Sequence, residues 1–176
     1  MEQQAFLERA VEQYGKATYN FAYRLTGNEA DASDLTQEAF IRVFRAWHSF
    51  KPGTSFRSWI FRIVTNLYRD ELRRRKGRYH EEIPDDNAPQ AGAGRLLAIE
   101  PIEEYVEGYL SEPVAKALAD LTDEQRNIVL LADIEGCSYQ EIGEIVGCAV
   151  GTVRSRLHRA RERLRDLLTR YMKSSS

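Results

Sequence analysis

Residues 151–165, GTVRSRLHRARERLR, contain six arginines in fifteen residues. Guanidinium groups neutralise phosphates and donate paired hydrogen bonds to base edges, so this composition suits nucleic-acid binding. At helical spacing the apolar side chains fall on one face, which we expect to be buried. That face holds Val153, Leu157, Ala160, Leu164 and Leu168. Arginines border it on both edges, with Arg154, Arg161 and Arg165 on one and Arg156, Arg159 and Arg163 on the other.

The outward face of this helix changes character along its length. Small and hydroxyl side chains such as Thr152 and Ser155 come first, and the acidic Glu162 and Asp166 follow. Carboxylates repel phosphates, so only the N-terminal half of the helix is expected to lie deep in a DNA groove.

The preceding segment, SYQEIGEIVGCAV, predicts the partner helix and turn of a helix-turn-helix. Ser138 and Glu141 have the spacing of a capping box, and Gly147 supplies the turn. Gly143 is small enough to let the two helices pack closely. An ordinary surface helix with arginine–glutamate pairs is the alternative for the arginine segment alone, and the preceding turn argues against it.

A second helix is expected to begin at Asn28 and to carry a charged face. Its side chains are Asp31, Asp34, Glu38, Arg42 and Arg45, with Gln37 beside them. The sign of the charge changes along the face, which suits a protein partner of complementary charge. A solvated helix face is the alternative.

A third helix is expected from about residue 55 to residue 76. Its predicted buried stripe is Phe56, Ile60, Ile63, Val64 and Leu67. The opposite face is predicted to gather Arg62, Arg69, Arg73 and Lys76 with Thr65 and Asn66, bordered by Trp59. A cationic track with a neighbouring aromatic ring suits single-stranded DNA, whose phosphates need neutralising and whose bases can stack.

The whole chain reads as all-α, with two small helical domains joined by a flexible acidic linker. We expect domains at residues 1–80 and 113–176 and the linker at 81–112, with net charges of +5, +1 and −8. Cys137 and Cys148 fit no redox or zinc spacing and are expected to be small apolar residues. No apolar run is long enough to cross a bilayer, so we expect a cytoplasmic protein without membrane insertion.

The segment SYQEIGEIVGCAVGTVRSRLHRARERLR resembles the C-terminal DNA-binding region of bacterial extracytoplasmic-function (ECF) sigma factors, the promoter-specificity subunits of RNA polymerase. The resemblance implies that this helix reads the minus-35 promoter element. It assigns base or backbone contacts to Thr152, Arg154, Ser155, His158 and Arg159. Ala149 stands where many members have proline, which bears only on the stiffness of the turn.

The segments DLTQEAFIRVFRAW and TSFRSWIFRIVTNLYRDELRRRK resemble the polymerase-binding and promoter-melting segments of the same family. The resemblance implies that the β′ clamp of core polymerase contacts Asp31, Asp34, Gln37, Glu38 and Arg42. It assigns capture of the unpaired minus-10 strand to Phe50, Lys51, Thr54, Trp59, Arg62, Asn66, Arg69 and Arg73. The loop before the third helix is the most variable part, and an ordinary helix connection is its alternative reading.

Family membership also implies contacts with the β subunit and an anti-sigma factor that masks polymerase-binding surfaces. The linker acids Glu81, Glu82, Asp85 and Asp86 could enter the RNA exit path of the polymerase, or could simply keep the linker soluble. No nucleophile motif, phosphate-binding glycine loop or metal cluster is present in the sequence, so we expect no enzyme activity, no cofactor and no small-molecule substrate. An autonomous helix-turn-helix regulator and a protein-interaction adaptor are the alternative functions.

Overall fold

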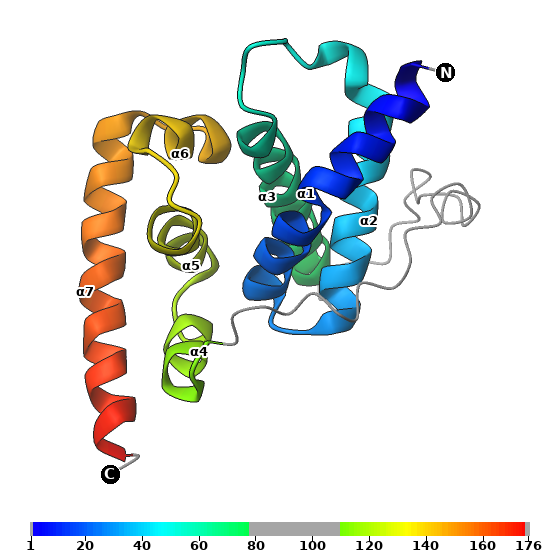
Figure 1. The fold of residues 1–176 in the computed structure, drawn as a ribbon. Coiled ribbons are helices and arrows are strands. Elements are labelled where there is room, and N and C mark those ends of the chain that lie inside the picture. The colour runs from blue at the N-terminus through cyan, green and yellow to red at the C-terminus, as the bar shows by residue number, and fades with distance from the viewer. Residues whose placement is uncertain (1, 78–109, 175–176) are drawn as a thin grey trace.

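The computed structural model describes residues 2–77 and 110–174, and every regular element within these ranges is helical. The first helical group contains α1 (Glu2–Thr26), α2 (Glu29–Ala46), the short 3-10 helix η1 (Trp47–Ser49) and α3 (Phe56–Gly77). The second contains α4 (Glu112–Ala119), α5 (Asp123–Val129), the π-helical turn η3 (Leu130–Ile134), α6 (Tyr139–Val146) and α7 (Val150–Ser174). The two groups lie side by side (Figure 1). The predicted all-α fold is therefore confirmed.

The first group is a three-helix bundle whose turns follow the sequence signals. Gly27, with φ of 78°, ends α1, because its left-handed backbone breaks the helix. Asn28 then caps α2 by accepting a 2.8 Å hydrogen bond from the backbone amide of Asp31. The rings of Phe21 and Phe61 pack 4.6 Å apart in the core between α1 and α3.

The second group is organised by two capping boxes. Thr122 with Gln125 begins α5, and Ser138 with Glu141 begins α6, as their spacing predicts. The hydrogen bond that the Ser138 backbone amide donates to the Glu141 carboxylate lowers the pKa of Glu141. Each cap satisfies amide groups that the helix leaves unpaired, so the starts of both helices are set locally.

The long α7 helix packs along α4, α5 and α6 through an apolar stripe. Val153, Leu157 and Ala160 are buried as predicted, whereas Leu164 and Leu168 are only half-buried. Leu167, which lies outside the predicted stripe, is buried. The stripe therefore shifts by about one residue over the last turns of the helix.

The two helical groups contact each other through α3 and α6. Glu135, which directly follows η3, is at the centre of the polar contacts. Its carboxylate lies 2.9 Å from Arg57 Nη2 and 3.2 Å from Arg24 Nη1, and its backbone carbonyl accepts a 2.6 Å hydrogen bond from Arg57 Nη2. Arg126 Nη1 adds a 3.3 Å hydrogen bond to the carbonyl of Leu25. These bonds join segments that are far apart in the sequence.

The structure describes both cysteines but not the linker acids. Cys137 is buried, and burial raises the pKa of its thiol to about 11, which fits an unreactive apolar residue, while Cys148 is half-buried. The acids Glu81, Glu82, Asp85 and Asp86 lie outside the described residues. Among the described helices none combines the length and apolar character needed to cross a membrane.

Candidate nucleic-acid interface

The turn between α6 and α7 sets the angle at which α7 is presented. Gly147 adopts a left-handed φ of 76°, and its amide and that of Cys148 donate to the carbonyl of Gly143 at 2.9 and 3.0 Å. A Cβ atom on Gly143 would lie 2.7 Å from the Cys148 carbonyl oxygen. The glycine therefore allows the turn to fold back onto α6, as the close packing expected from the sequence requires.

The six arginines of residues 151–165 in α7 fall into two classes. Arg161 forms a two-bond ion pair with Asp133 at 2.6 and 3.1 Å, and Arg156 lies 2.6 Å from Glu124. Asp133 raises the pKa of Arg161. The remaining four, Arg154, Arg159, Arg163 and Arg165, are exposed and form no ion pair within the described residues. Two of the six are thus used to hold α7 to α5 and η3.

The five side chains assigned to the minus-35 element lie in the first three turns of α7. Arg154, Ser155, His158 and Arg159 are exposed, and Thr152 is half-buried. The hydroxyl of Ser155 donates to the carbonyl of Thr152 at 3.1 Å, and His158 Nε2 lies 3.4 Å from Glu162 Oε1. The N-terminal half of α7 therefore presents two unpaired guanidinium groups and small polar side chains to solvent.

The cationic track on α3 is shorter than the sequence suggests. Arg62 and Asn66 are exposed, but Thr65 is fully buried, so its placement on the track is wrong. Arg69 is half-buried, and its Nη1 donates to the carbonyl of Val146 at the end of α6. Arg73 is exposed and lies 3.5 Å from Asp70.

The reason for this difference is that α3 is buried on two sides. The predicted stripe covers Phe56, Ile60, Val64 and Leu67, and the structure adds Phe61, Thr65 and Tyr68, while Ile63 is only half-buried. Together these side chains cover about half of the helix circumference, because α3 packs on α1 and α2 of its own group and also on α6 of the other. Burial also raises the pKa of Tyr68 to about 12, and its hydroxyl donates to Asp123 at 3.1 Å.

The connection between α2 and α3 divides into an exposed tip and an aromatic base. Lys51 and Thr54 are exposed, as expected for residues that contact a ligand. Phe50 and Trp59 are half-buried, and their rings lie 5.3 Å apart within a larger aromatic cluster. Packing therefore covers much of the surface of these two rings, and part of it remains exposed.

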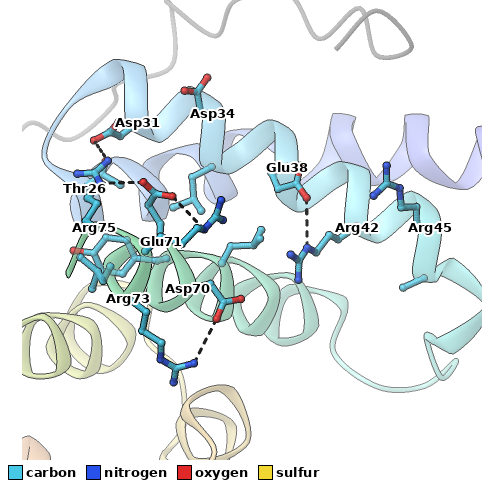
Figure 2. A pocket seen from close by; sticks show the side chains of 16 residues that line it. Thr26, Asp31, Asp34, Glu38, Arg42, Arg45, Asp70, Glu71, Arg73 and Arg75 are labelled. Atoms are coloured by element: carbon cyan, nitrogen blue, oxygen red, sulfur yellow. Dashed lines mark hydrogen bonds and ion pairs between the residues drawn. The ribbon is translucent and has the colours of Figure 1, made fainter. Parts of the chain in front are cut away.

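The charged face of α2 lines a groove between α2 and α3 (Figure 2). Asp31 lies 3.1 Å from Arg75 of α3, and Glu38 pairs with Arg42 at 3.5 Å. Hydrogen bonds from the side chains of Asn28 and Arg75 lower the pKa of Asp31, and the bond from Asn28 has the larger effect. Asp34 is exposed and forms no ion pair within the described residues, and Figure 2 shows it pointing away from α3.

Gln37, the remaining member of the predicted polymerase-binding set, lies outside this groove. Its side chain is exposed and donates to Ser33 within α2 at 3.5 Å. Arg45, by contrast, lines the groove. The structure thus brings together most of the predicted charged face and extends it onto the last turns of α3.

The residues that sequence reasoning missed are those that join the two helical groups. Arg24, Arg57 and Glu135 are separated by tens of residues, so no local motif reveals their contact. Burial raises the pKa of Glu135, against the opposing effect of the two arginines.

Within residues 2–77 and 110–174 no three His, Cys, Asp or Glu side chains are placed to hold a metal ion.

Two family models match the chain, and each covers one helical group. Sigma-70 region 2 matches residues 10–78, and sigma-70 region 4 matches residues 111–164. The chain therefore belongs to the sigma-70 family. The relatives place it among the ECF RNA polymerase sigma factors, which are proteins of transcription initiation.

Two curated relatives illustrate the likeness. The ECF sigma factor SigE of Mycolicibacterium smegmatis is 45% identical over 166 residues, which make up 93% of this chain but only 62% of that protein. The chain thus spans less than two thirds of this relative. SigW of Bacillus subtilis is 35% identical over 175 residues, which are 95% of this chain and 90% of that protein.

Two solved structures have a similar arrangement of helices. The sigma factor RpoE in complex with the anti-sigma factor NepR from Bartonella quintana has a TM-score of 0.70 at 28% identity and covers 92% of this chain and 96% of that one. CnrH in complex with the cytosolic domain of CnrY has a TM-score of 0.64 at 27% identity, with coverage of 94% and 89%.

Proposed function

We propose that this chain binds core RNA polymerase and directs it to a minus-35 and a minus-10 promoter element, where it helps to open the DNA. The observation that carries the proposal is the presence of two separate cationic surfaces. One is the N-terminal half of α7, where Arg154 and Arg159 are exposed and have no ion pair with any described residue, and the other is the side of α3 that presents Arg62 and Asn66. An intact duplex suits the first surface, and an unpaired strand suits the second.

The division of labour follows the division of the chain. Residues 1–80 would bind polymerase and the minus-10 element, residues 113–176 would bind the minus-35 element, and residues 81–112 would connect them. In this proposal the polymerase supplies the chemistry, and the chain contributes binding surfaces and sequence choice. We place its action in the cytoplasm, with the polymerase.

Besides promoter DNA and the anti-sigma factor, the proposal includes core RNA polymerase as a partner. The mixed-charge groove between α2 and α3 suits the β′ clamp of core polymerase, and the β subunit is included as a further contact of the same enzyme. An anti-sigma factor is a third partner, supported by the likeness to two sigma factors solved with such proteins. The linker acids are proposed to follow the RNA exit path.

Replacing Arg159 with alanine is expected to relax selection at the minus-35 element. Arg159 is exposed and has no ion pair within the described residues, so its guanidinium is available for a base edge. A lost bidentate contact is worth about 1 to 3 kcal/mol, which is roughly a 5- to 150-fold loss of discrimination. Transcription by holoenzyme from promoters with altered minus-35 sequences measures the effect. Arg161→Ala is the matched control, because Arg161 is paired with Asp133 and should affect stability rather than sequence choice.

Replacing Asp34 with lysine is expected to weaken binding to core polymerase by about tenfold, because it reverses an exposed charge at the proposed clamp surface. The isolated interaction with core enzyme can be measured by fluorescence anisotropy. Glu29→Lys, an equal charge change at an exposed position of α2 outside the groove, serves as the control. Equal losses for both variants would contradict a specific role of Asp34.

The whole proposal is tested by transcription in vitro with purified core polymerase on a promoter library. Selection of two elements separated by a fixed spacing is the expected result. An autonomous regulator would instead bind a duplex operator tightly without polymerase, usually as a dimer on a palindrome. A protein-interaction adaptor would keep its activity when Arg154 and Arg159 are both replaced.

A further inference from the structure

Aromatic rings underlie the connection between α2 and α3. The cluster, here called the aromatic base, consists of Phe6, Tyr14, Trp47, Phe50, Phe56 and Trp59. Ring centroids are 5.3 Å apart for Phe50 and Trp59, and 5.5 Å for Phe50 and Phe56 and for Phe56 and Trp59. These separations lie in the range at which aromatic pairs attract each other. The connection is therefore supported from below by packed rings.

Phe6 belongs to α1 and contacts both ends of the connection. Its ring centroid lies 6.1 Å from Trp47 and from Phe50, which precede the tip, and 5.8 Å from Phe56, which follows it. The side-chain amide of Gln3 donates to the carbonyl of Phe44 at 2.6 Å and fixes the start of α1 to the end of α2. Phe6 thus holds together two points of the chain between which the tip projects.

The tip itself, residues 51–54, is exposed, and its hydrogen bonds to described residues are local. The amide and the hydroxyl of Thr54 donate to the carbonyl of Lys51 at 3.2 and 2.7 Å. Gly53 allows this turn with a left-handed φ of 87°. Because the turn is closed on itself, its position relative to α3 depends on the aromatic base.

The base also aligns the tip with the exposed side of α3. Trp59, Arg62 and Asn66 are separated by three and four residues, so they share one face of the helix. Trp59 packs against Phe50 at the foot of the tip. Movement of the rings would therefore shift the tip with respect to the polar side chains of α3.

We propose that Phe6 is a positioning residue for promoter recognition, which seats the tip so that Lys51 and Thr54 can capture an unpaired base next to Asn66. The inference rests on the proposed function, in which this connection holds the non-template strand. Phe6 touches no DNA and acts through Phe50 and Phe56. Loss of its ring leaves the tip intact but lets it occupy several positions, so discrimination between bases falls more than overall affinity.

The test uses holoenzyme carrying Phe6→Leu and single-stranded oligonucleotides of the non-template minus-10 sequence. The cognate oligonucleotide is compared with one substituted at the most selective position found in the promoter library. We expect the ratio of the two affinities to fall at least fivefold in Phe6→Leu and to return in Phe6→Tyr, which keeps the ring. Tyr23→Leu, which removes another half-buried ring of α1 far from the connection, should keep the ratio within twofold.

The outcomes separate the inference from the proposed function. The variants Lys51→Ala and Thr54→Ala show whether the tip discriminates between the two oligonucleotides. If either lowers the ratio of affinities while Phe6→Leu weakens both oligonucleotides equally and leaves the ratio unchanged, the positioning role is overturned. If neither tip variant changes the ratio, the proposed role of the connection fails, and the inference fails with it. If Phe6→Leu does not assemble with core polymerase, Gln3→Ala replaces it, because loss of the Gln3 bond to Phe44 loosens the same turn of α1. We expect Gln3→Ala to lower the ratio of affinities at least twofold. An unchanged ratio in that variant overturns the inference.

Discussion

Replacing Gly143 with alanine is expected to destabilise the second helical group by about 2 kcal/mol. The added Cβ would lie 2.7 Å from the carbonyl oxygen of Cys148, a backbone atom that cannot rotate away. Overpacking of this kind costs about 1 to 3 kcal/mol or more, and the better helix propensity of alanine offsets up to about 1 kcal/mol. Urea unfolding of the full chain, followed by far-ultraviolet circular dichroism, measures the change.

Gly151→Ala provides the matched control on the same helix-turn-helix. Gly151 lies in α7, its backbone is helical, and beyond its chain neighbours and the adjacent helix backbone no atom of the described chain lies within 4 Å of its Cβ position. Alanine there should therefore stabilise the protein by about 0.5 to 1 kcal/mol, because the unfolded chain loses freedom and no contact is strained. A change of the same sign in both variants would show that helix propensity, and not the close approach at the turn, governs position 143.

The helix boundaries could be predicted because their causes are local. Gly27, Asn28, Thr122 and Ser138 each end or cap a helix through atoms within a few residues, and the sequence contains both partners. Periodicity likewise identified the buried start of α7. It failed at Leu167, where the buried stripe shifts because α7 packs on three shorter helices rather than on one.

The candidate site was predicted less completely, because part of it depends on contacts between the helical groups. A hydrophobic period reveals one buried face for each helix, whereas α3 has two. Thr65 and Arg69 fell on the apparently solvated side, yet Thr65 is fully buried, and Arg69 donates to the carbonyl of Val146 in α6, 77 residues away. Glu135 was missed for a related reason. The π-helical turn Leu130–Ile134 changes the direction of the residues after it, and a regular helical period cannot place them.

Replacing Glu135 with arginine is expected to separate the two helical groups. The carboxylate is 8% exposed and lies between Arg24 and Arg57, so a third guanidinium would replace two attractions with two repulsions. Removing one partner of a buried ion pair costs about 3 to 5 kcal/mol. The 37% exposure of the Arg57 side chain lowers this cost. We expect the free energy that holds the two groups together to fall by about 2 kcal/mol, which lowers the ratio of packed to separated molecules roughly 30-fold.

Small-angle scattering of the purified chain measures the separation as an increase in the radius of gyration. Glu144→Arg carries the same change of charge at an exposed position of α6 and should leave the radius unchanged. Combining Glu135→Arg with Arg57→Glu restores opposite charges across the contact and should recover part of the packing.

The separated form also releases Arg69 from the carbonyl of Val146. If Glu135→Arg binds single-stranded minus-10 DNA no better than the unaltered chain while its radius increases, Arg69 contributes nothing to strand capture and is removed from the proposed minus-10 surface.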